Sequence, residues 1–152
     1  MIILLCLTIF SGALLSIQAA INARLSQTVG ILSTTFLTFA LGALITFLLA
    51  IFLESNHTQH LLSVPKWQLM GAFLGVPYIL IMTFAVPRVG VAIATVAVIL
   101  GQLLMSLMID QYGWFNNPII TFSWHHALAS FFLFIALIFI YKSNKTHNVM
   151  SN

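Results

Sequence analysis

Residues 25–53 of the chain read LSQTVGILSTTFLTFALGALITFLLAIFL and carry no charged side chain. A hydrocarbon core about 30 Å thick is crossed by roughly 20 helical residues, so this stretch is long enough to span a bilayer. The other uncharged stretches of similar length are residues 1–23, 67–87, 89–109 and 111–141. The charges that separate the stretches are Arg24, Glu54, Lys66, Arg88, Asp110, Lys142 and Lys145.

The composition excludes a soluble protein, because 61% of the residues are hydrophobic and only 5% are charged. Helices are expected, since lipid cannot satisfy backbone N–H and C=O groups and residues 40–53 lack the alternation of a membrane barrel strand. A chain of 152 residues leaves almost no room for a soluble domain. The sequence therefore predicts an all-α, polytopic membrane bundle that forms a single domain over residues 1–152.

Five transmembrane helices are predicted from the apolar runs and the residues that punctuate them. Gly30 precedes the second helix, and Pro65 precedes the third at a position where a missing N–H costs little. Pro87 and Arg88 are expected to form the turn into the fourth helix. Pro77 should kink the third helix or mark an opening of its backbone. The predicted helices cover residues 2–22, 31–53, 67–86, 89–109 and 121–141.

The distribution of basic residues predicts an orientation. With five spans, Arg24, Arg88, Lys142 and Lys145 lie on one side of the membrane and Lys66 lies on the other. Cytoplasmic loops are enriched in Lys and Arg. We therefore expect the N-terminus outside and the C-terminus in the cytoplasm.

Small residues recur along single faces of several predicted helices. Such stripes allow two helix backbones to approach closely in lipid, where no hydrophobic force drives association. The fifth helix is instead rich in phenylalanine between residues 131 and 139 and is expected to face lipid or another subunit. The predicted packing positions are Gly12, Ser16, Gly71, Gly75, Gly90, Ala94 and Gly101.

Uncharged polar residues form stripes on two helices. Gln18 and Asn22 share a face with Ser11 on the first helix, and Gln102 lies in a stripe of the same spacing on the fourth. Amides at membrane depth need partners, which can be a neighbouring helix or a solute. Both readings stay open for each residue, although two stripes together exceed what packing needs. Gln18, Asn22 and Gln102 are therefore candidate substrate-binding residues.

Arg88 and Asp110 bracket the fourth helix and are further candidates for substrate binding. Each has an alternative role, Arg88 as an interfacial anchor and Asp110 as a solvated helix end. No carboxylate lies deep in a span, which disfavours a simple proton-coupled multidrug antiporter.

Other functional classes find little support in the residues. Histidines and carboxylates gather on the predicted outer side, but a polar loop normally solvates such groups, and no metal or cofactor is predicted. There is no nucleophile–base pair or nucleotide loop within a span, so an enzyme is not expected. No basic cluster indicates a nucleic-acid partner. The histidines and carboxylates on the predicted outer side are Glu54, His57, His60, Asp110, His125 and His126.

Several segments resemble the YdcZ-type small family of the drug/metabolite transporter (DMT) superfamily. They are QAAINARL at residues 18–25, PKWQL at 65–69, VPRVG at 86–90 and GQLL at 101–104. They occur in the family's order and cover the chain to about residue 115, together with Gly30, Phe39, Gly42, Gly71, Gly75, Ile109, Asp110 and Gly113.

The resemblance implies a bacterial inner-membrane, DMT/EamA-like half-transporter of five helices. Such chains are thought to work as antiparallel pairs, either homodimers or heterodimers with a related five-helix chain. The charge bias of this chain favours a related partner of opposite orientation. The expected function is a secondary transporter that exports a small organic solute by alternating access. The alternative is a non-transporting membrane subunit that scaffolds or regulates a larger complex.

Overall fold

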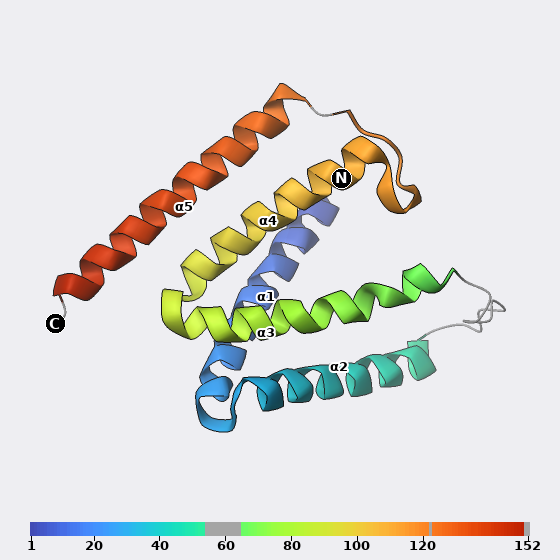
Figure 1. Cartoon of the computed structure of the whole chain (residues 1–152). Helices are drawn as coiled ribbons and strands as arrows, with labels where there is room; N and C mark the ends of the chain where they lie inside the picture. Colours follow the sequence, from blue (N-terminus) through green and yellow to red (C-terminus); the bar gives the residue numbers. More distant parts are fainter. Residues whose placement is uncertain (54–64, 122, 151–152) are drawn as a thin grey trace. The chain divides into compact units, whose positions relative to one another are not determined.

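The computed structural model describes residues 1–53, 65–121 and 123–150, with side chains as far as Ser143. Over these ranges the chain is helical apart from short connections and contains no strand (Figure 1). It divides into two units, Met1–Arg88 and Val89–Asn152. The elements are α1 (Ile2–Val29), α2 (Ile31–Leu53), the 3-10 helix η2 (Lys66–Met70), α3 (Gly71–Val89), α4 (Val91–Tyr112), the 3-10 helix η3 (Trp114–Asn116) and α5 (Trp124–Met150).

Five helical segments of the described chain are long and apolar enough to cross a membrane. Large apolar side chains on them are exposed, including Phe36 at 71%, Phe52 at 80% and Phe73 at 74%. An exterior of this kind is stable in lipid and would be an aggregation hazard in water. The prediction of a five-helix membrane bundle is therefore confirmed.

The helix boundaries differ from the predicted ones mainly where a charge or a proline was taken as an end. α1 continues through Arg24 to Val29, and α3 continues through Pro87 and Arg88 to Val89. The turn expected at Pro87 and Arg88 is made instead by Gly90. Pro77 also lies within α3, which is one continuous element.

The first unit is built on close packing between α1 and α2. Apart from Asn22, its buried residues on these helices are small: Ala19, Ala23, Thr34 and Thr35 are each 8% exposed or less. Small side chains let the two backbones approach, which is how helices gain contact area in lipid. The third helix also touches the second, because a Cβ at Gly75 would lie 3.3 Å from the Phe39 ring.

Two single-glycine connections have nearly the same backbone conformation. Gly30 joins α1 to α2 with φ 88° and ψ 159°, and Gly90 joins α3 to α4 with φ 87° and ψ 157°. Each carbonyl accepts a backbone bond from four residues on, from Thr34 at 3.1 Å and from Ala94 at 3.2 Å. This region of φ/ψ space is essentially reserved for glycine. Both turns therefore depend on the lack of a side chain.

The second unit packs α4 against α5. Gly113 ends α4 in a left-handed conformation, φ 61°, and donates its N–H to the carbonyl of Ile109. The connection then folds back, and the Ile120 N–H donates to the Asp110 carbonyl over 2.9 Å. These bonds satisfy carbonyls that would otherwise be open at the helix end.

Candidate polar site in the first unit

Asn22 links the first two helices through a side-chain hydrogen bond. It is only 8% exposed, and its Oδ1 accepts a bond of 3.0 Å from Thr38 Oγ1 on α2. The same hydroxyl lies 2.9 Å from the Thr34 carbonyl of its own helix. A buried amide in an apolar helix requires such a partner. The contact holds Asn22 in place within the first unit.

The hydroxyls of α2 are satisfied mainly by their own helix. Thr34, Thr35 and Thr46 each donate to the carbonyl four residues earlier, at 2.9 Å in every case. This local bond is the usual way for threonine to meet its hydrogen-bonding need inside a span. These hydroxyls are thus less available for a solute than the Asn22 amide.

A small polar pocket lies between α1 and α3. Its volume is about 10 Å³, which is the space of about one water molecule. Gln18 and Asn22 line it from α1, so the structure brings these two predicted site residues together. Asn22 is buried, whereas Gln18 is exposed and lies at the edge of the buried core. The full lining is Leu15, Gln18, Ala19, Asn22, Tyr78, Ile79, Met82 and Thr83.

Thr83 is a lining residue that the sequence reasoning missed. It is 1% exposed, and its hydroxyl has no hydrogen-bond partner among the described residues. The sequence-based prediction for α3 was based on its glycines and prolines. The available signal was a hydroxyl in the middle of an apolar helix, since polar groups at membrane depth are costly and often functional. Tyr78 also lines the pocket from the same helix.

Arg88 is held by its own helix. Its guanidinium donates to the Phe84 carbonyl and lies over the Phe84 ring, 3.6 Å from the ring centroid. A cation over an aromatic face is attracted by the ring quadrupole. Both contacts position the charge beside the last turn of α3.

The remaining predicted site residues, Gln102 and Asp110, belong to the second unit. Gln102 is exposed on α4, and Asp110 is partly exposed near the C-terminal end of the same helix. No group of three potential metal ligands occurs among the residues that the structure describes. Glu54, His57 and His60 lie outside the described ranges.

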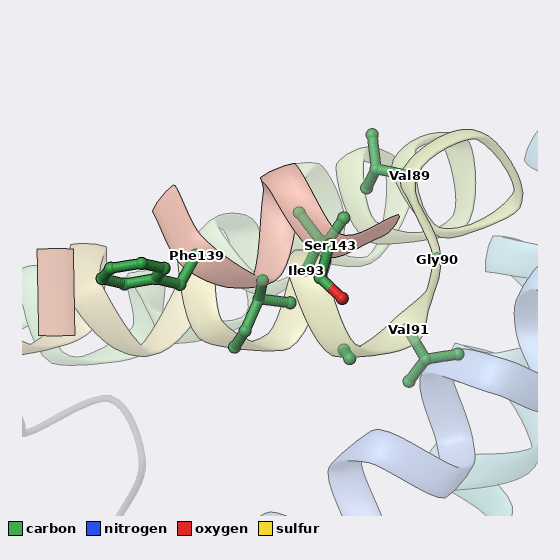
Figure 2. A pocket seen from close by; sticks show the side chains of 8 residues that line it. Val89, Gly90, Val91, Ile93, Phe139 and Ser143 are labelled. Atoms are coloured by element: carbon green, nitrogen blue, oxygen red, sulfur yellow. The ribbon is translucent and has the colours of Figure 1, made fainter. Parts of the chain in front are cut away.

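The second unit also contains an open apolar groove of about 610 Å³, at the start of α4 and beside Phe139, Ile140 and Ser143 of α5. Figure 2 shows the Ser143 hydroxyl beside the apolar side chains of this groove. None of the candidate substrate-binding residues lines it; of the predicted packing positions, Gly90 does.

The predicted packing positions occupy varied surroundings. A Cβ at Gly12, Gly71 or Gly101 would have no neighbour within 4 Å, whereas Gly75 faces Phe39. Ala94 is 5% exposed, and Ser16 donates to the Gly12 carbonyl over 3.3 Å. Their role in helix packing stays a prediction.

The architecture and the intramembrane polar pocket define a multi-pass helical membrane protein. Comparison with known families finds a match over residues 3–139 to the family described as "Putative inner membrane exporter, YdcZ". The chain therefore belongs to this DMT family, which confirms the resemblance seen in the sequence. No curated protein and no solved structure matched the chain.

Proposed function

We propose that the chain is one half of a secondary transporter that exports a small organic solute. The observation that carries this proposal is the joining of Gln18 and Asn22 at one polar pocket inside otherwise apolar helices. The family's description as an inner-membrane exporter supports the direction of transport. The solute hydrogen-bonds to the two amides at membrane depth, where few competing waters are present.

Pairing is the second part of this proposal. Five helices are few to enclose a gated polar path, and two inverted copies would place two polar pockets around a shared midplane. Each five-helix chain of the pair alternates between an opening on one side of the membrane and an opening on the other, while the solute stays near the pockets. The partner is a second copy in antiparallel orientation or a related five-helix chain, and the charge bias favours the related chain.

The other predicted site residues, Arg88, Gln102 and Asp110, have further roles in this proposal. Arg88 neutralises an anionic part of the solute near the cytoplasmic side, or it anchors α3, a role that its contacts with Phe84 support. Gln102, midway along α4, is a further candidate for hydrogen-bonding the solute. Asp110 is the acidic candidate at a helix mouth, suited to a cation or a proton.

A metabolite and toxic-compound accumulation profile tests transport. We expect expression of the wild-type chain, with its closest related chain from the same source, to lower the cellular level of one solute class. Gln18→Ala/Asn22→Ala at equal membrane level should restore the baseline, because the solute loses both amides. Thr46→Ala is the matched control, since its hydroxyl bonds within α2 and is exposed. An unchanged profile with either partner arrangement would favour the scaffold or regulatory subunit.

Reporter fusions test the orientation. A cytoplasmic reporter at the C-terminus should be active and a periplasmic one inactive, because four of the five basic residues lie on the C-terminal side of the predicted topology. Arg24→Ala/Arg88→Ala should shift the signal toward a mixed orientation. Equal activity of the two reporters on the wild-type chain would contradict the single orientation and favour a dual-topology homodimer.

A further inference from the structure

Thr83 differs from the threonines whose hydroxyls make a hydrogen bond in the structure. Thr8, Thr28, Thr34, Thr35, Thr38 and Thr46 all donate to a carbonyl three or four residues earlier. The Thr83 hydroxyl makes no such bond within the described structure, although it is 1% exposed. The Thr95 hydroxyl on α4 is also buried without a partner there, but Thr95 does not line the pocket. A buried hydroxyl without a partner destabilises the folded state, because it has lost its bonds to water. Its position at a pocket indicates that a bound group satisfies it.

The backbone at Thr83 is also unusual. An α-helical carbonyl normally accepts a bond from the N–H four residues on, which here is the position of Pro87. Proline has no N–H, so this bond is missing from the helical ladder. Thr83 therefore combines an unpartnered hydroxyl with a carbonyl that lacks its regular intrahelical donor.

The pocket beside Thr83 restricts what can bind there. Its polar lining residues are Gln18, Asn22, Tyr78 and Thr83, and no charged residue lines it. Amides and hydroxyls both donate and accept hydrogen bonds. A charged group would be left without a counter-ion in a span, which is costly. The volume of about 10 Å³ admits one small polar group.

We propose that Thr83, with Gln18 and Asn22, forms a subsite for the terminal oxygen or nitrogen atom of one uncharged hydroxyl or carboxamide group of the solute. A water molecule takes the same place when no solute is bound. This inference rests on the proposed function and deepens it, because it names the chemical class of the group that the first unit recognises.

Thermal unfolding of the purified full chain in lipid nanodiscs tests the subsite without any transport assay. Thr83→Val keeps the side-chain shape and removes the hydroxyl, so we expect the Tm to fall by about 2–4 °C through loss of a bond to the bound water. Thr83→Ser should retain most of the wild-type Tm. Thr46→Val is the control, with little change expected because its hydroxyl is exposed. A Tm for Thr83→Val at or above that of wild type would overturn the inference.

Small probes test the chemical class in the same samples. Acetamide is expected to raise the Tm of the wild-type chain, because a ligand that binds only the folded state stabilises that state. The Tm of Thr83→Val should not rise, because this variant lacks the hydroxyl that binds the probe. Acetate and methylammonium at the same concentration should have no such Thr83-dependent effect. An equal response to all three probes would overturn the assignment of an uncharged group.

The two claims fail in different ways. Thr83-dependent stabilisation by acetamide together with an unchanged accumulation profile would support the subsite and reject transport. A solute whose export is unaffected by Thr83→Val, with no acetamide effect on the Tm, would support transport and overturn the subsite.

Discussion

Replacing Gly30 or Gly90 with alanine is expected to lower the free energy of unfolding by about 1–3 kcal/mol for each substitution. Both residues have φ near 88° with extended ψ, a combination that a Cβ disfavours. The space around a Cβ at Gly30 is open, so at that position the cost arises from the backbone alone. Unfolding of the purified variants by heat or denaturant in nanodiscs measures the effect.

Gly42→Ala is the matched control for these glycine substitutions. Gly42 lies inside α2, where a Cβ would have no neighbour within 4 Å. Alanine is a better helix former than glycine by about 1 kcal/mol, so this variant should be as stable as wild type or more so. The claim that both turns require glycine would be contradicted if the three variants were equally stable: Gly30→Ala, Gly90→Ala and Gly42→Ala.

Asn22→Ala is expected to reduce export about tenfold or more, in addition to a loss of stability of about 1 kcal/mol. The stability loss follows from the missing bond to Thr38, which joins α1 to α2 over 3.0 Å. The loss of export follows from the missing amide at the pocket. Export is measured as the rate of solute loss from cells with equal membrane levels of each variant.

Thr38→Val separates these two effects of Asn22. It removes the same interhelical bond and leaves the Asn22 amide at the pocket, so its stability loss should be similar and its export close to wild type. A parallel loss of export in both variants would show that Asn22 acts only through helix packing. The scaffold or regulatory subunit would then be the better account.

Most of the fold could be predicted because span length and hydropathy follow directly from the bilayer. The limits of α2 agree with the predicted residues 31–53, since Gly30 begins the helix and the apolar run continues to the next charge. The predicted ends of α1 and α3 were too early. Arg24 is compatible with a helix that has reached the membrane surface. Pro87 removes the intrahelical bond to the Thr83 carbonyl, but transmembrane helices tolerate proline where other groups satisfy the freed carbonyl.

The polar site was only partly predictable. The spacing of Gln18 and Asn22 placed them on one face, because periodicity along a helix is fixed by its geometry. Periodicity does not say which neighbouring helix that face meets. Thr38 was therefore not assigned as the partner of Asn22, and Thr83 was not assigned to the same pocket. The unpartnered state of the Thr83 hydroxyl depends on its rotamer and on the packing of α3, which no pattern within one helix contains.

Solute efflux from proteoliposomes tests the central claim most directly. Vesicles would be loaded with the solute class found in the accumulation profile and would contain the purified chain with its related partner. The account predicts efflux from vesicles containing the wild-type or Thr38→Val chain, and an at least tenfold slower rate with Asn22→Ala. No efflux above that of protein-free vesicles, or equal rates for wild type and Asn22→Ala, would contradict transport through this polar site.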